Sequence, residues 1–229
     1  KWSVIACDQF SSEPAYWERV EKNVDGSPSA LRFIVPEARL ESVDPIASAD
    51  AAGAEMERYI KAGLLRTLDR SFIYVERSLT DGSVRRGLVG MLDLEAYDYR
   101  PGSTSAVRAS EKTIVSRLPA RMEIRKRARL ELPHIMALIN DEAQNVIETL
   151  AARTPTFEQV YDFELMEGGG HIRGWHITGR ECDETISRLT SLFSACSVQI
   201  IIGDGNHSLA AAKDYWDEFK NTLSDSERT

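Results

Sequence analysis

The sequence has little cysteine and no long hydrophobic run. Its three cysteines are too few, and odd in number, for a disulfide framework, so we expect a reducing, cytoplasmic environment. No apolar stretch is long enough to span a bilayer, and we expect no contact with a membrane. A Gly-x-Ser-x-Gly segment is also lacking, which argues against a hydrolase that uses such a serine. The remaining composition, 42% hydrophobic and 28% charged, is that of a globular protein.

Positive charge is in deficit overall but locally concentrated. The chain has 28 Lys and Arg against 36 Asp and Glu, a net charge of −8, which disfavours a general nucleic-acid binder. Within one basic segment an arginine recurs at every fourth residue: Arg117, Arg121, Arg125 and Arg129. On one helix they would form a basic stripe that meets phosphates or an acidic partner. The favoured interpretation is a solvated helix face with Glu123 and Glu131 as partners.

The pattern of elements predicts an α+β protein. Asp81-Gly82 and the three glycines at 168–170 each separate two strand-like segments, which predicts two hairpins. Residues 198–202 are wholly apolar, as in the middle of a covered sheet. We predict further strands at 2–7, 31–40 and 134–139, and helices at 14–25, 48–68, 110–118, 119–130, 141–152, 183–195 and 209–220. This mixture predicts a mixed sheet with hairpins and flanking helices.

The most informative segment runs from the apolar strand into the last helix. It reads Gly203-Asp204-Gly205-Asn206-His207-Ser208 and is followed by an Ala-rich helix. A helix N-terminus offers unpaired N–H groups and partial positive charge, which suit a phosphate. The glycines allow close approach of a ligand or positive φ. The spacing is not that of a Walker A loop. The alternative is a tight turn in which Asp204 or Asn206 caps the helix.

Two further segments supply candidates to complete a site. Arg108 and Glu111 enter a predicted helix at i, i+3 and would share a face, a pairing suited to phosphoryl transfer. The alternative is a helix start with Ser110 as cap. Asp8 and Gln9 follow the first predicted strand, and Asp8 would bind substrate or a metal, or cap a turn.

Asp204 is the better metal candidate because it lies inside the glycine loop. An enzyme that uses a nucleotide needs Mg²⁺, which proteins hold with few carboxylates plus phosphates. Such a site leaves little signature in a sequence.

Five segments together resemble the domain-of-unknown-function 1015 family of bacterial and archaeal proteins. They are Ala6-Cys7-Asp8-Gln9-Phe10, Val84-Arg85-Arg86-Gly87-Leu88-Val89-Gly90, Asp93-Leu94-Glu95-Ala96-Tyr97-Asp98-Tyr99, Arg108-Ala109-Ser110-Glu111 and Asp204-Gly205-Asn206-His207-Ser208. The resemblance covers nearly the whole chain. Because family members are longer, it implies that residues 1–229 are one mixed α/β unit, the N-terminal and central part of a longer protein.

The resemblance also implies a function. Some members read Asp-Gly-His-His-Arg at the last motif, which is similar to the phosphate-binding motif of ParB-like, sulfiredoxin-like and free-serine-kinase proteins. Family genes tend to neighbour serine-biosynthesis genes. This implies a ParB/sulfiredoxin-like core and an enzyme that binds a phosphate or nucleotide (ATP or ADP with Mg²⁺) and acts on serine or phosphoserine. Here Ser208 replaces the arginine, so a bidentate phosphate donor is absent and the charge must be met elsewhere.

The leading hypothesis is therefore a phosphotransferase or phosphatase. The predicted catalytic residues are Glu111 for acid–base chemistry, Arg108 for charge stabilisation, and His207. Substrate is expected at Asp8 and Gln9, and a metal at Asp204. The predicted phosphate ligands are Gly203, Asp204, Gly205, Asn206, His207 and Ser208. A non-catalytic sensor of a phosphorylated metabolite is the second hypothesis. A ParB-like nucleic-acid binder that uses the basic stripe is the third.

Overall fold

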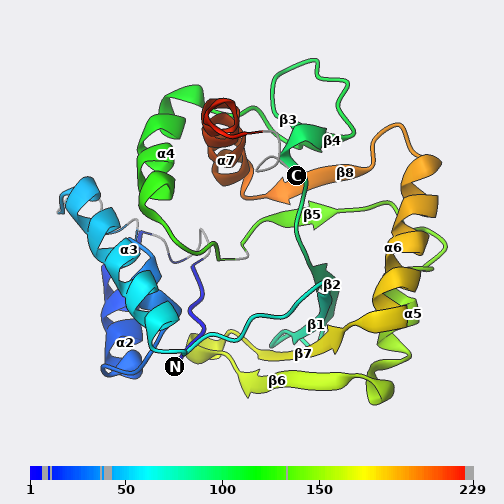
Figure 1. The fold of residues 1–229 in the computed structure, drawn as a ribbon. Coiled ribbons are helices and arrows are strands. Elements are labelled where there is room, and N and C mark those ends of the chain that lie inside the picture. Colours follow the sequence, from blue (N-terminus) through cyan, green and yellow to red (C-terminus); the bar gives the residue numbers. More distant parts are fainter. Residues whose placement is uncertain (7–9, 11, 37, 39–42, 133, 225–229) are drawn as a thin grey trace. The chain divides into compact units, whose positions relative to one another are not determined.

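The computed structural model describes residues 1–6, 10, 12–36, 38, 43–132 and 134–224 (Figure 1). The chain divides into two compact units. The first contains Lys1–Gly90, Ala128–Leu130 and Gln144–Ile186, and the second contains Met91–Arg127, Glu131–Ala143 and Ser187–Thr229. Each unit has a four-stranded sheet with helices, which confirms the α+β class. No helix among these residues has the length and apolar character needed to cross a membrane.

The sheet of the first unit is antiparallel and contains both predicted hairpins. Its order is β2-β1-β7-β6. The strands are β1 (Phe72–Ser78), β2 (Val84–Val89), β6 (Glu158–Glu164) and β7 (His171–Ile177). Gly82, in the turn between β1 and β2, has φ +84°, as the Asp-Gly pair predicts. The two hairpins join through β1 and β7, which pair in register from Phe72↔Ile177 to Ser78↔His171.

The helices of the first unit pack in two hydrophobic clusters. In one, α5 (Ile147–Ala151) packs Leu150 against Tyr74, Trp175 and Ile177 of the sheet. In the other, Tyr16, Trp17, Val20 and Val24 of α2 (Pro14–Val24) surround Leu31. The helix α3 (Pro45–Lys61) buries Ala52, Met56 and Tyr59, as its periodicity predicts, but ends before Leu64. The helix α6 (Gly179–Ser194) starts in this unit.

The predicted strands at 2–7 and 31–40 are wrong. The described part of the first segment is irregular, and the second begins with a short 3-10 helix, Ala30–Phe33. The ring of Trp2 packs against Phe33 at 5.9 Å and Tyr59 at 6.0 Å between centroids, and its carbonyl accepts the N–H of Ala30. The apolar side chains therefore pack against a helix and an irregular segment rather than joining a sheet.

The sheet of the second unit is mixed and has the order β3-β4-β8-β5. The strands β3 (Tyr97–Asp98), β4 (Val107–Ala109) and β8 (Ile200–Asp204) are parallel, and β5 (Met136–Leu138) is antiparallel to β8. The helix α7 (Asn206–Phe219) covers one face through Leu209 and Ala212. Its Ala210 and Ala211 pack against α4 (Leu118–Arg127), so the small side chains do allow a close approach.

The interior position of β8 is confirmed, but its expected burial on both faces is wrong. Ile202 is fully buried beneath α7, whereas Ile201 is 43% exposed. Leu138, which pairs with Ile201 on β5, is 51% exposed. Because alternate side chains of a strand point to opposite faces, one face of this part of the sheet is covered and the other is open to solvent.

The predicted helix over 110–118 is also wrong. Residues 110–114 form an irregular segment, which is followed by a 3-10 turn (Val115–Arg117) and then by α4. The N–H of Ser110 is directed to the carbonyl of Ile202 on the neighbouring strand, at 3.3 Å. Contacts across the sheet therefore override the local helical pattern here.

Candidate functional site

The carboxyl ends of β4 and β8 bring two of the predicted segments together. The strands pair in parallel, with Arg108 opposite Ile201 and Ala109 opposite Ile202. Ser110 and Glu111 therefore leave the sheet at the same edge as the Gly205 turn. Ligands of α/β proteins usually bind at this edge. The structure thus places Glu111 beside the start of α7, where the phosphate-binding turn is expected.

Asn206 fastens the two segments to each other. It is 3% exposed, and its Oδ1 accepts the N–H of Ser110 at 3.3 Å while its Nδ2 donates to the hydroxyl of Ser110 at 3.2 Å. One side chain thereby bonds both the backbone and the side chain of the opposite segment. Asn206 positions the site, and its amide is not directed to the first turn of α7.

His207 faces the same segment and orients one of its nitrogens toward a carboxylate. Its Nε2 accepts the N–H of Ile114 at 3.0 Å, so this hydrogen-bond network assigns the ring proton to Nδ1. The Nδ1 atom lies 3.9 Å from Oε1 of Glu111, whose side chain is 61% exposed. The pair sets an imidazole N–H opposite a carboxylate at the mouth of the turn, an arrangement that can move a proton to or from a bound hydroxyl.

The N-terminus of α7 has no side-chain cap. Its N-cap residue is Gly205, and within the part of the chain that the structure describes no side-chain cap bond is formed there. Asp204 instead accepts the N–H of Gly205 with its Oδ1 at 2.7 Å. The prediction that Asp204 or Asn206 caps this helix is therefore wrong. A 14-residue helix keeps its first N–H groups available, where the helix dipole favours an anion.

Gly205 is required by the conformation of the chain itself, whereas Gly203 lies only against the flexible, half-exposed side chain of Leu138. Gly205 has φ +79°, and a Cβ there would lie 2.7 Å from Cδ1 of Ile135. A Cβ on Gly203 would lie 2.9 Å from Cδ1 of Leu138. The positive φ predicted for this turn is confirmed at Gly205. The space beside both glycines is filled by the segment that contains β5, so a ligand would meet the turn through its N–H groups.

Arg108 does not share a helical face with Glu111, which corrects the sequence prediction. Arg108 lies in β4, and its Nε donates to the carbonyl of Ser105 at 2.7 Å. Glu111 lies in the irregular segment that follows the strand. Residues at i and i+3 share a face only in a helix, and this segment is not helical.

The remaining predicted ligands are placed as follows. Asp204 is exposed at the end of β8. Within the described part of the chain, no group of three or more His, Cys, Asp or Glu is arranged to hold a metal ion. Asp8 and Gln9, the predicted substrate ligands, lie outside the described residues. A magnesium ion at this turn would therefore depend mainly on the phosphate oxygens of its ligand.

Thr113 is a residue that the sequence reasoning missed. It is 6% exposed, and its hydroxyl has no partner among the described residues. It precedes Ile114, whose N–H bonds to His207. Nothing in the local sequence distinguishes this threonine, because its burial results from contacts of the folded segment.

Three of the four basic residues of α4 are paired with carboxylates, as the favoured interpretation expects, and the fourth, Arg121, donates to the carbonyl of Arg117. Arg125 bonds to Glu131, and Lys126 and Arg127 bond to Glu123. Arg117 and Arg129 lie outside α4, and Arg129 belongs to the first unit, where it contacts Glu57 at 3.1 Å. The four arginines of the expected stripe therefore do not share one helix.

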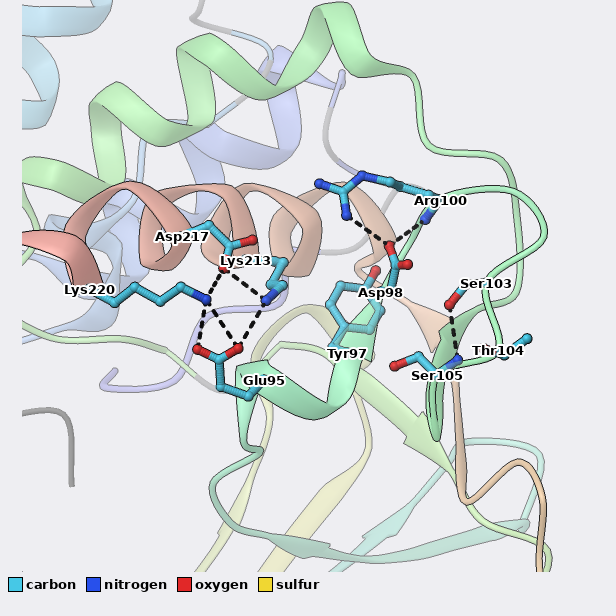
Figure 2. Close-up of a pocket in the computed structure, with 10 residues that line it drawn as sticks. All are labelled: Glu95, Tyr97, Asp98, Arg100, Ser103, Thr104, Ser105, Lys213, Asp217 and Lys220. Atoms are coloured by element: carbon cyan, nitrogen blue, oxygen red, sulfur yellow. Dashed lines mark hydrogen bonds and ion pairs between the residues drawn. The ribbon is translucent and has the colours of Figure 1, made fainter.

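A cavity lies farther along α7. It has a volume of about 540 Å³ and is lined by side chains of α7 and of the segment around β3 (Figure 2). Lys213 projects from α7 into this region, and only 7% of it is exposed. Sequence reasoning did not select it, because the carboxylates that hold it come from distant positions or from the next helical turn.

Comparison with known proteins tests the resemblance carried by the sequence motifs. No curated protein and no solved structure matches the chain. The family model described as "Protein of unknown function (DUF1015)" matches residues 1–229, the whole chain. The chain therefore belongs to the domain-of-unknown-function 1015 family.

Proposed function

We propose that the turn between β8 and α7 binds the phosphate of a small phosphorylated molecule. The observation that carries this proposal is the uncapped first turn of α7. Asp204 and Asn206 are residue types that often cap helices, yet both are bonded elsewhere. The N–H groups and the dipole of a 14-residue helix then favour an anionic ligand.

The proposed reaction is phosphoryl transfer to serine, or hydrolysis of phosphoserine. Glu111 supports it because this carboxylate faces Nδ1 of His207 at 3.9 Å beside the turn, where it accepts the proton of a substrate hydroxyl. Arg108 is bonded to the carbonyl of Ser105 and Ser208 is uncharged, so neither residue brings positive charge to the phosphate. Mg²⁺ bound together with ATP or ADP would offset the negative charge of the phosphate, with Asp204 as the protein ligand of the ion. The choice of serine rests on the family resemblance.

A sensor that binds a phosphorylated metabolite without reaction is the second candidate. The exposure of Glu111, 61% of its side chain, favours it, since acid–base groups act best where water is excluded. The carboxylates that pair with the basic residues of α4 lend no support to a nucleic-acid binder.

Isothermal titration with ATP, ADP, serine and phosphoserine, each with and without Mg²⁺, tests the proposal. The variant Ser208→Glu places a carboxylate in the first turn of α7. It should abolish binding of a phosphorylated ligand and leave the free energy of unfolding equal or higher by up to about 1 kcal/mol. Ala15→Glu adds the same charge to the first turn of α2 and should leave binding unchanged. Absence of heat with every ligand, or normal binding by Ser208→Glu, would reject the site.

Glu111→Gln separates the enzyme from the sensor. An enzyme should keep its affinity and lose turnover by about 10²-fold or more, measured as release of ADP or inorganic phosphate. A sensor has no turnover to lose, and its affinity should also persist. If the wild-type protein binds phosphoserine but releases no product, the sensor is the correct candidate.

A further inference from the structure

The cavity beside α7 has two charged walls, both within the second unit. Figure 2 shows Glu95, Lys213, Asp217 and Lys220 grouped on one side of Tyr97, and Asp98 and Arg100 on the other. Glu95 comes from the 3-10 turn Leu94–Ala96, Lys213 comes from α7, and Lys220 begins the 3-10 turn Lys220–Thr222 that follows α7. This cavity is formed by different residues from those of the turn before α7.

The first wall is a group of four charges of alternating sign. The Nζ of Lys220 lies 2.8 Å from Glu95 and 2.7 Å from Asp217, and the Nζ of Lys213 lies 2.9 Å from Asp217 and 3.6 Å from Glu95. The hydrogen bond from Lys220 holds the pKa of Glu95 below its usual value. The carboxyls of Glu95 and Asp217, whose pKa is likewise lowered, are therefore ionised at neutral pH.

Lys213 has unused hydrogen-bonding capacity. An ammonium group has three N–H donors, and the described residues supply one acceptor within hydrogen-bond distance, Asp217. The side chain is only 9% exposed and lines the cavity, so the donors that the described residues do not use are open to a molecule that enters it. A ligand that carries acceptor oxygens would form charge-assisted hydrogen bonds with them.

The second wall presents a carboxylate. Oδ1 of Asp98 accepts the backbone N–H of Arg100 at 3.0 Å and lies 3.5 Å from its guanidinium, which is largely exposed. Both contacts use the same oxygen, so Oδ2 remains for another donor. Ser103, Thr104 and Ser105 continue this wall with hydroxyl groups.

The charges that line the cavity cancel. Three cations, Lys213, Lys220 and Arg100, are matched by three anions, Glu95, Asp98 and Asp217. A simple anion that approaches the lysines also meets Glu95 and Asp217, and a simple cation meets the lysines. A molecule with one charge of each sign has an opposite charge beside each of its ends, and these two attractions together offset the repulsions.

We propose that this cavity binds a small zwitterion, an amino acid or a short peptide, whose carboxylate is received by Lys213 and whose ammonium is received by Asp98. The volume of about 540 Å³ is sufficient for either. The site is independent of the phosphate-binding turn proposed above. A ligand there would tie α7 to the segment that follows β3.

Isothermal titration with four probes tests the chemistry of the ligand. Glycine and glycylglycine carry both charges, acetate carries only the negative charge, and ethylammonium only the positive one. At least one zwitterion should bind about tenfold or more tightly than either single-charge probe, as expected for charge-assisted hydrogen bonds at both ends. Equal affinity for acetate, or no binding of either zwitterion, would overturn the proposal.

Variants test the assigned residues. Asp98→Asn, at a partly exposed position, should weaken the zwitterion about tenfold and preserve the fold, and Lys213→Met should remove binding. Lys126→Gln is the matched control, since it removes a lysine of the same unit that pairs with Glu123 and Glu218 outside the cavity. Unchanged affinity in Asp98→Asn would reject the assignment. Ser208→Glu should leave zwitterion binding intact, which separates this site from the phosphate-binding turn.

Discussion

The two ends of α7 use different chemistry. At its N-terminus, the turn is shaped by glycine, and Asn206 fastens it to Ser110 through two hydrogen bonds between uncharged groups. At its C-terminal half, the contacts are between charged side chains, with Lys213 and Lys220 shared by Glu95 and Asp217. The comparison teaches that the first end depends on volume and hydrogen-bond geometry, whereas the second depends on protonation.

The largest effect is expected from Gly205→Ala. The change adds strain at φ +79° and places a Cβ 2.7 Å from Ile135, so we expect a loss of about 2–3 kcal/mol in the free energy of unfolding. Gly102→Ala is the control in the same unit: Gly102 has φ +80° but no heavy atom within 4 Å of its added Cβ. It should cost only about 1 kcal/mol. Equal losses in urea unfolding would show that volume does not limit the turn.

A smaller loss is expected from Asn206→Ala. It leaves the N–H and hydroxyl of Ser110 without their side-chain partner, which should cost about 1–3 kcal/mol. Asn206→Asp keeps the oxygen that accepts the N–H of Ser110 and replaces the amide donor with a second oxygen, to which the hydroxyl of Ser110 can donate. It also adds a charge that a helix N-terminus favours, so its stability should stay near that of the wild type. Chemical denaturation compares the two. A stable alanine variant would show that the tie between the segments contributes little.

The charged end should respond to acid. A hydrogen bond from Lys220 lowers the pKa of Glu95. Partial burial raises the pKa of Asp217, but hydrogen bonds from Lys220 and Lys213 outweigh this effect and lower it overall. In the folded protein the pKa values of Glu95 and Asp217 lie below the ordinary values of 4.5 and 3.8. The two ionised carboxyls therefore stabilise the fold fully above pH 4.5, and this stabilisation is lost as the pH falls through their folded pKa values. Glu95→Gln should flatten the acid side of the stability profile by under about 1 kcal/mol. An unchanged profile would contradict the charge dependence.

A histidine of the first unit should give a response of opposite sign. Glu164 and Asp162 raise the pKa of His171 above 6.5. Its stabilisation is therefore complete below pH 6.5 and declines as pH rises through the folded value. His171→Gln should remove this decline and leave the acid side unaltered. Thermal unfolding between pH 5 and pH 9 measures it, and a persistent decline in the variant would assign the effect to another group.

Local patterns predicted the elements whose contacts are local. The Asp81-Gly82 hairpin and the strand–turn–helix around Gly205 follow from turn residues and apolar runs that act within a few positions. The helix expected at 110–118 does not form. The N–H of Ile114, which would bond to the carbonyl of Ser110 in a helix, donates instead to Nε2 of His207, far along the chain. The single N–H of Ser110 is shared between Ile202 and Asn206. Helical propensity is a weak preference that such contacts override.

The part of the candidate site that could be predicted is likewise the part that depends on neighbouring residues in the sequence. Residues 203–208 stand out in the sequence, and the structure places Glu111 beside them. The burial of Thr113 and the contacts of Lys213 with Glu95 depend on which strands pair, and no spacing in the sequence records that pairing. The same limit explains why Arg108 was assigned to a helix.

The discontinuity of the second unit has a consequence for its biosynthesis. Its parallel pair joins Val107 to Ile200, and residues 144–186, which belong to the first unit, are made between them. A ribosome therefore releases β4 and the segment with Ser110 long before the strand that completes their sheet. The hairpin of β6 and β7 is complete before β8 emerges. The turn that we propose as the phosphate site is thus assembled only after β8 has emerged, and until then β4 is without its long-range partner.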